Sequence, residues 1–266
     1  MFFFFKQKTA YEMVRSDWSS ACALPILLAQ EGFRGPARVF EGTHGFFNGF
    51  GGKNDYRFDK LLELGKQWEI PKLAFKSYPC GSISHPYMDC ALRIKQKHAP
   101  APDEIREVVC RTAEGPVHRL WEPLADKQKP VSSYGAKFSL PYSIAVMLVH
   151  GRAGLEEFTD AAIHDPAVLK LAAKVRYVLD PTIDYPRHFS GHVKVTMADG
   201  RVLEENQPHP RGGLEDPLPP SEIEEKFRAN ARLALRETRV DDIVDTVSRL
   251  DEIPSISILT EKLIPR

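Results

Sequence analysis

The chain has 266 residues, and its 36 basic and 36 acidic side chains give a formal net charge of zero. This balance provides no global field that would attract nucleic acid or an anionic membrane, and no apolar run approaches the roughly eighteen residues of a membrane-spanning helix. The four cysteines lack the density and paired spacing of a disulfide scaffold, so we expect reduced thiols and a cytoplasmic protein.

Residues 1–27 differ in composition from the rest of the chain. They begin with four consecutive phenylalanines and show neither helical nor strand periodicity. Glu12 and Asp17 lie where a signal peptide should be free of acidic residues. The segment resembles a translated sequencing adapter, so we expect it to be non-native and to contribute nothing to the core. The alternative is a genuine N-terminal extension.

Residues 28–71 contain short helical patterns interrupted by glycine and proline. A Gly49-x-Gly51-Gly52 run lies among them. It lacks the G-x-G-x-x-G spacing of a dinucleotide-binding loop and follows no strand, so it favours a turn between helices.

Residues 76–92 hold the densest group of chemically useful side chains. Pro79 and Gly81 cannot belong to a regular helix interior, so the chain from Lys76 is expected to run extended into a loop. From Ser84 onward the pattern predicts a helix, with this serine as its cap and a proline in its first turn. The expected apolar stripe of this helix comprises Met88, Ala91, Leu92 and Ile94.

Two residues make this loop the leading candidate for a binding site. Lys76 precedes the loop and His85 lies at the helix start, where a cationic or titratable side chain suits the binding of an anionic substrate. The alternatives that stay open are a solvated lysine at a strand end and a histidine bonded to backbone.

Two groups of residues could be imagined as metal ligands. The first comprises Cys80, His85, Asp89 and Cys90. Its spacing matches no common zinc pattern, and Cys90 should lie on the apolar side of its helix, so we predict no metal site. The second comprises His188 and His192, but Gly191 and the strand after it argue against a ligating helix face. We expect a solvent-exposed or loop-packed pair there.

Residues 72–211 show mixed helical and strand patterns. Ile105–Thr112 is rich in β-branched residues and predicts a strand. Val193–Met197 alternates by face, and Asp199-Gly200 then predicts a hairpin with Arg201–Leu203. Helices are expected over residues 138–150 and 166–174, the second with Asp165 as its N-cap. This order of elements indicates an α+β layer.

Residues 212–266 return to helical patterns. Ser221 and Glu224 have the spacing of a capping box, and apolar residues follow at helical intervals. Further helices are expected over Val240–Leu250 and Ser255–Leu263.

Five passages occur in the order found in one known family. The first holds Lys76, Tyr78-Pro79, His85 and Asp89-Cys90-Ala91. The other four are Glu41–Phe47, Ala136–Ser143, Asp165–Val168, and Asp216–Pro219 leading to Lys226-Phe227. In these passages the chain resembles the MmgE/PrpD family, which includes 2-methylcitrate dehydratase and cis-aconitate decarboxylase.

The resemblance implies an α+β domain inserted into an all-helical domain that is only partly present. Residues 28–71 would then be a remnant of the helical domain, residues 72–211 the α+β domain, and residues 212–266 the helices that complete the helical domain. The chain is therefore expected to be a C-terminal portion, a homodimer when full length, and inactive alone, since the family's principal acid-base residues come from the missing helical half.

The resemblance also implies a lyase that needs no metal or other cofactor and eliminates water from a small polycarboxylate, as 2-methylcitrate dehydratase does. Lys76 would bind a carboxylate, His85 would bind substrate or shuttle protons, and Tyr142 would donate a hydrogen bond. Some relatives carry a pocket histidine where this chain has Gly81, so the substrate stays open. The alternatives are decarboxylation of cis-aconitate, epimerisation of iminodisuccinate, and a non-catalytic truncated product. For Tyr142 the alternative is a half-buried tyrosine with a satisfied hydroxyl.

Overall fold

The computed structural model describes residues 29–32, 34, 40, 45–51, 58–66, 68, 70 and 73–264. The chain divides into two compact units, Met1–Trp68 and Glu69–Arg266. Within the described part of the first unit lie helix α3 (Phe46–Gly51) and the 3-10 helix η1 (Phe58–Glu63). Gly49 and Gly51 therefore belong to a helix and not to the predicted turn, and Gly52, the last residue of that run, lies outside the described residues. The predicted non-native segment, residues 1–27, lies outside the described residues.

A four-stranded mixed sheet forms the centre of the second unit. Its strands are β1 (Ile105–Thr112), β2 (Val175–Leu179), β3 (Gly191–Met197) and β4 (Val202–Gln207). They lie in the order β2-β1-β3-β4, in which only the β1–β2 pair is parallel. The predicted β1 strand and β3–β4 hairpin are confirmed, and Gly200 in the hairpin turn has the positive φ of 90° that favours glycine.

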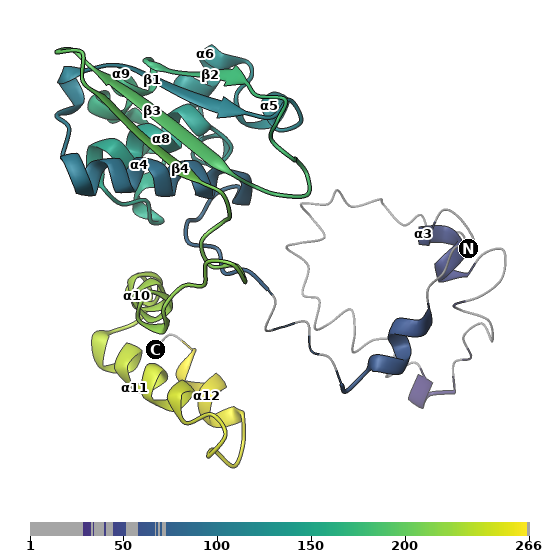
Figure 1. Ribbon diagram of the computed structural model, residues 1–266. Coiled ribbons are helices and arrows are strands. Elements are labelled where there is room, and N and C mark those ends of the chain that lie inside the picture. The colour runs from purple at the N-terminus through teal and green to yellow at the C-terminus, as the bar shows by residue number, and fades with distance from the viewer. Residues whose placement is uncertain are drawn as a thin grey trace, which may run out of the picture. The chain divides into compact units, whose positions relative to one another are not determined.

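Three longer helices cover one face of this sheet, as Figure 1 shows. They are α4 (His85–His98), α8 (Leu140–His150) and α9 (Pro166–Ala172). The shorter helical segments are η3 (Ser82–Ser84), η4 (Pro102–Glu104), α5 (Val117–Leu120), α6 (Leu124–Gln128), α7 (Ser133–Ala136), η5 (Glu156–Phe158) and η6 (Ala162–His164). Helices packed on a mixed sheet confirm the α+β class.

The helix caps follow the local sequence at two of the three helices that cover the sheet. The Ser139 hydroxyl accepts a hydrogen bond from the Tyr142 amide at 3.1 Å, and the Asp165 carboxylate accepts one from the Ala167 amide at 2.8 Å. Both residues have the side-chain type that caps a helix best. The predicted Ser84 cap is wrong. The η3 turn runs directly into α4, so Ser84 has helical dihedrals and its side chain makes no capping bond.

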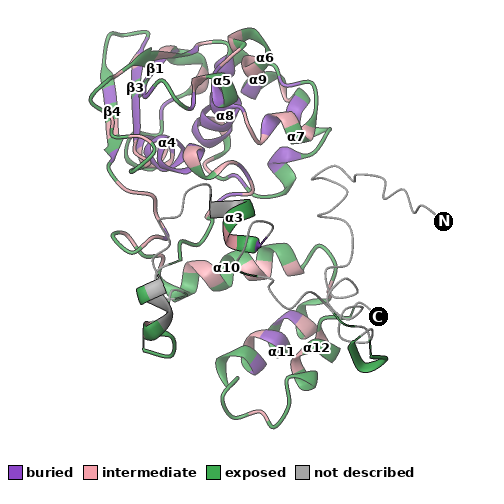
Figure 2. Ribbon diagram, turned by 90° about the vertical axis from the view of Figure 1, so that its right-hand side faces the viewer, coloured by how far each residue is buried: buried purple, intermediate pink, exposed green. Residues whose placement is uncertain are grey.

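The hydrophobic core lies between the sheet and these helices. Figure 2 shows buried residues along α4, α8 and the strands, and in α8 they are the nine consecutive residues Leu140 to Leu148. Met88, Ala91 and Ile94 of the predicted α4 stripe are fully buried, and Leu92 is half-buried. The stripe is therefore confirmed, and it holds the first turn of α4 firmly against the sheet.

The C-terminal segment contains three helices. They are α10 (Pro220–Ala231), α11 (Glu237–Ser248) and α12 (Ser257–Lys262). Their existence was predicted, but the capping box at Ser221 was not confirmed: α10 already begins at Pro220 and has no side-chain cap. Glu224 instead pairs with Arg228 one turn later, at 2.8 Å. Helix α10 buries no residue fully, whereas α11 buries Val240 and Ile243.

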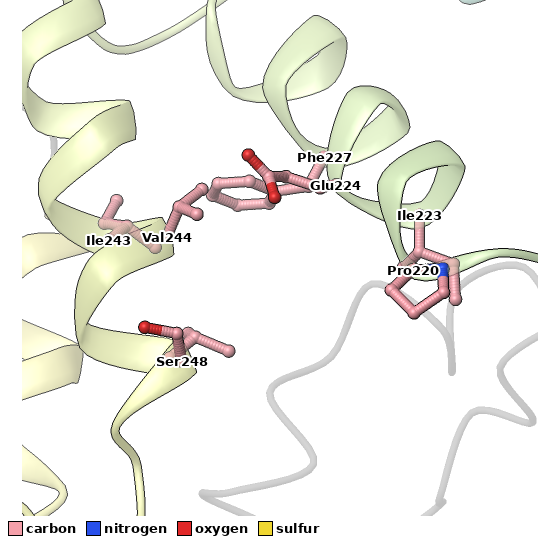
Figure 3. Close-up of a pocket in the computed structure, with 8 residues that line it drawn as sticks. Pro220, Ile223, Glu224, Phe227, Ile243, Val244 and Ser248 are labelled. Carbon is pink, nitrogen blue, oxygen red and sulfur yellow. The ribbon is translucent and has the colours of Figure 1, made fainter.

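An apolar groove of about 360 Å³ runs between α10 and α11, and Figure 3 shows Phe227 pointing from α10 toward Val244 of α11. Its lining consists of Pro220, Ile223, Glu224, Phe227, Ile243, Val244, Val247 and Ser248. Within this lining Val247 is 50% exposed, and Leu250, which follows later in the chain, is 44% exposed. Contiguous apolar surface of this kind favours association.

We expect the isolated chain to associate through this groove. Light scattering over a range of concentrations should show a mass above that of the monomer, and Val247→Glu should shift the distribution toward the monomer because a charge in an apolar contact is costly. Val131→Glu is the matched control, since Val131 is 93% exposed and lies outside the groove. A monomeric wild-type chain at all concentrations would contradict this expectation.

Candidate functional site

The loop before α4 positions the first predicted site residue. The Lys76 side chain is exposed, and its Nζ donates a hydrogen bond to the Cys80 carbonyl at 3.3 Å. The loop is anchored by the Gly81 amide, which donates to the Lys137 carbonyl at 3.0 Å. Lys76 is therefore held along the loop that leads into the helix.

The second predicted residue, His85, is the first residue of α4. It is only 3% exposed, and its ring lies edge-on to the Tyr78 ring with the centroids 5.3 Å apart. The pKa of His85 is lowered to about 4, chiefly by burial and in part by the ammonium groups of Lys76 and Lys226, while hydrogen bonds with the Cys80 and Tyr78 carbonyls act in the opposite direction. His85 is therefore a neutral imidazole near pH 7, able to accept a proton.

Asp89 lies one turn further along α4 and is 1% exposed. The Tyr78 hydroxyl donates to its Oδ1 at 2.6 Å, and Arg211 Nη1 lies 3.8 Å from the same oxygen. Burial raises the pKa of Asp89, while the bond from Tyr78 and the charge of Arg211 act against the rise. Tyr78 thus connects a buried carboxyl group with the face of His85.

Buried polar atoms without a hydrogen-bond partner concentrate in this segment. Among the described residues there are five such side-chain atoms, and four lie between residues 77 and 89. These four are Ser77 Oγ, Ser84 Oγ, His85 Nε2 and Asp89 Oδ2, and the fifth is Trp121 Nε1. Buried polar groups in folded proteins are nearly always paired, so a cluster of orphaned atoms indicates a place where a polar ligand or water binds.

The C-terminal segment adds two cations to the border of this loop. Lys226 on α10 donates a hydrogen bond from Nζ to the Lys76 carbonyl, and Arg211 pairs with Glu222 as well as approaching Asp89. A polar cavity of about 450 Å³ lies beside them. It is lined by Asp89, Leu92, Arg93, Gln96, Arg211, Glu222 and Glu225.

Sequence reasoning assigned no role to Tyr78, Arg211 or Lys226. Tyr78 and Lys226 occur in the passages that resemble the MmgE/PrpD family, but no contact or chemical role was predicted for either residue. Arg211 carries no local signal at all, because its contact with α4 depends on how the chain returns after β4.

Tyr142 lies in a different set of contacts. It is 1% exposed, its hydroxyl donates to the Glu157 carbonyl at 2.7 Å, and its ring meets the Phe158 ring with centroids 5.9 Å apart. These contacts involve neither Lys76 nor His85. The hydroxyl would have to leave Glu157 to donate to a substrate, and the predicted role of Tyr142 in catalysis stays a prediction.

We expect Tyr142→Phe to lower the free energy of unfolding by about 1 kcal/mol, because the Glu157 carbonyl loses its donor. Urea denaturation measures this change. Tyr134→Phe serves as the control, since Tyr134 is 66% exposed. Equal stability of the two variants would show that the hydrogen bond from Tyr142 to the Glu157 carbonyl does not stabilise the fold.

The cysteines and remaining histidines make separate contacts. Cys80 and Cys90 are buried, as expected for Cys90, and burial raises the pKa of each thiol to about 12. His188 is exposed, whereas His192 is buried in β3 and its Nε2 lies 2.6 Å from a Glu204 carboxylate oxygen. The predicted exposed or loop-packed pair is therefore wrong, because His192 is part of a strand.

The described residues were also compared with the requirements of a metal site and of a membrane-spanning helix. Among the described residues, no group of three or more His, Cys, Asp or Glu side chains is arranged to hold a metal ion. None of the described helices has the length and apolar character needed to cross a membrane.

Comparisons with known proteins place these features in a family. Residues 78–252 match the family model described as the MmgE/PrpD C-terminal domain. A cis-aconitate decarboxylase-like protein of Aspergillus oryzae is 29% identical over 246 residues, which cover 87% of this chain and 50% of that protein. The cis-aconitate decarboxylase of Homo sapiens is 26% identical, with 89% and 49% covered.

The 2-methylcitrate dehydratase of Cupriavidus necator is 26% identical over 198 residues, which cover 71% of this chain and 40% of that protein. The chain thus spans about half the length of the cis-aconitate decarboxylases it matches. The matched residues include the loop from Tyr78 onward, all of α4 and the C-terminal helices α10 and α11, while Lys76 lies two residues before the match. The chain belongs to the MmgE/PrpD family.

Proposed function

We propose that this chain forms part of a lyase that binds a small polycarboxylate and eliminates water from it, as in 2-methylcitrate dehydratase. The observation that carries the proposal is the cluster of orphaned polar atoms between residues 77 and 89, bordered by the Lys76 ammonium. A carboxylate-bearing ligand would supply acceptors for the serine hydroxyls and a negative charge for the lysine.

The proposed chemistry uses these residues in distinct roles. Lys76 binds a substrate carboxylate and stabilises the negative charge that develops when the neighbouring carbon loses its proton. His85 is neutral, so Nε2 can accept a proton and return it to the departing hydroxyl. The oxygen then leaves as water and a carbon–carbon double bond forms. Further acid-base residues would come from the part of the longer relatives that this chain does not match.

Decarboxylation of cis-aconitate is the second candidate. It is favoured by the names of relatives that match this chain over about half their length. In this reaction the bond to one carboxylate breaks, carbon dioxide leaves, and the electron pair remains on carbon until a proton is delivered. Both reactions place negative charge beside a carboxylate, so the same cation would serve either one.

Steady-state turnover of 2-methylcitrate and of cis-aconitate tests the proposal. The assay compares the chain alone with the chain fused to the N-terminal half of the Aspergillus oryzae relative. We expect no turnover by the chain alone, since each missing proton transfer contributes about 100- to 10,000-fold. The fusion should convert one of the two substrates, and the substrate that it converts decides between the two candidates.

In the active fusion, Lys76→Ala should lower kcat/KM by about 100-fold, because a bound carboxylate loses its charged hydrogen-bond partner. Lys76→Arg should restore only part of this loss, since a planar guanidinium does not reproduce a compact ammonium. Lys129→Ala, at an exposed lysine elsewhere, is the control. Turnover of the Lys76→Ala fusion at the wild-type rate would remove Lys76 from the site.

A further inference from the structure

Two lysines from distant parts of the chain meet at the loop before α4. The Lys76 ammonium donates to the Cys80 carbonyl, and the Lys226 ammonium, on α10, donates to the Lys76 carbonyl. An ammonium group has three N–H donors. Each lysine therefore retains N–H groups for a ligand after the one hydrogen bond that it makes within residues 73–264.

These two positive charges have no carboxylate partner in the same range. Among residues 73–264, Arg211 and Arg228 both form ion pairs with acidic side chains, whereas Lys76 and Lys226 bond only to carbonyl oxygens. Both ammonium groups act on the buried His85 imidazole. Two positive charges that border one loop without counterions attract negative charge, so the binding of an anion beside this loop would be favoured.

The neighbouring orphaned atoms complete the arrangement. His85 is only 3% exposed, and Ser84 is fully buried. The Ser84 hydroxyl and His85 Nε2 both lack a partner among the described residues. Two cations therefore border the same loop as two buried polar groups that need hydrogen bonds.

We propose that Lys226 is a second carboxylate-binding residue of this site, so that the ligand is held by Lys76 and Lys226 through two different carboxylates. The inference rests on the proposed function and extends it to the C-terminal helix α10. An acid with at least two carboxylates could offer a separate carboxylate to each ammonium group, and each pair would form a charge-assisted hydrogen bond.

A purely structural role for Lys226 predicts a different behaviour. In that case its ammonium only ties α10 to the loop through the Lys76 carbonyl. Lys226→Gln separates the two roles, because an amide retains N–H donors but has no charge. Lys226→Arg keeps both the charge and the donors, and should therefore bind the ligand more tightly than Lys226→Gln does, although a planar guanidinium does not fully replace an ammonium.

The experiment titrates this chain with tricarballylate, a tricarboxylate without a hydroxyl group, and follows the His85 imidazole signal by NMR. The signal is assigned by its loss in His85→Gln. We expect a saturable shift for the wild type, about 10- to 100-fold weaker binding for Lys226→Gln, and an affinity between these two for Lys226→Arg. Lys129→Gln, at an exposed lysine outside the loop, should bind as the wild type does.

The other outcomes contradict either the inference about Lys226 or the proposed function. If Lys76→Gln weakens binding but Lys226→Gln does not, the inference fails and the proposed function stands. If the wild type shows no shift, the proposed binding site fails, and the inference fails with it. If Lys226→Gln and Lys226→Arg both lose binding together with thermal stability, Lys226 is only a structural tie and the inference is wrong.

Discussion

Replacing Gly191 by alanine should lower the free energy of unfolding by about 3 kcal/mol, measured by urea denaturation. A Cβ at this position would lie 2.3 Å from the Pro86 carbonyl carbon and 2.5 Å from the Tyr87 amide nitrogen. Both are backbone atoms of the first turn of α4, which cannot rotate aside as a side chain can. Strand β3 or helix α4 would have to move, and α4 is held by the fully buried side chains of Met88, Ala91 and Ile94.

The same displacement should reach the candidate site, because His85 directly precedes Pro86 in this turn. The His85 NMR signal should therefore shift in Gly191→Ala even without ligand. Gly81→Ala is the matched control: its nearest atoms would be the Lys137 carbonyl oxygen and the Phe138 ring at 3.7 Å, an ordinary contact. A Gly191→Ala protein as stable as Gly81→Ala would show that β3 does not press on α4.

The chain should also lose stability as the pH falls from 6.5 toward 4, with a contribution from His85 on the order of 3 kcal/mol. The pKa of His85 is about 4 in the folded chain and 6.5 in the unfolded chain. Between these values the unfolded state binds one more proton than the folded state, so the free energy of unfolding rises with pH. The contribution of His85 to the free energy of unfolding is complete above pH 6.5 and is lost progressively as the pH falls toward 4.

His85→Gln should remove this dependence while keeping a polar side chain at the helix start. The comparison has to be a difference between the two proteins, because the raised pKa of Asp89 contributes with the opposite sign. Denaturation midpoints at several pH values between 4 and 7 provide the measurement. Parallel pH profiles for the wild type and His85→Gln would mean that the imidazole is not buried in its neutral form.

The sequence alone determined those elements whose signals are local. Proline and an aspartate cap mark the start of α9, β-branched residues mark β1, and an Asp-Gly pair marks the β3–β4 turn. Each signal acts over a few residues, so each could be recognised without knowledge of distant contacts. Lys76 and His85 became candidates because they flank one loop and because that passage resembles the MmgE/PrpD family.

Only the tertiary structure decided the features that depend on distant partners. Strand β2 was not predicted, because it is a short edge strand whose parallel partner β1 lies a long crossover away. Ser84 looked like a cap, but η3 and α4 join without a break and give it helical dihedrals. For Tyr142 the sequence left two possibilities open, a hydrogen bond to a substrate or a hydroxyl satisfied within the protein, and in the fold the hydroxyl donates to the Glu157 carbonyl.

The candidate site divides in the same way. The sequence determined that a lysine and a histidine flank a proline-containing loop. It could not show that His85 is buried and neutral, that four polar atoms between residues 77 and 89 lack partners, or that Arg211 and Lys226 return to this loop. The burial of a side chain and the charges around it depend on which segments of the chain are in contact. These contacts are set by packing across the whole unit and not by neighbouring residues in the sequence.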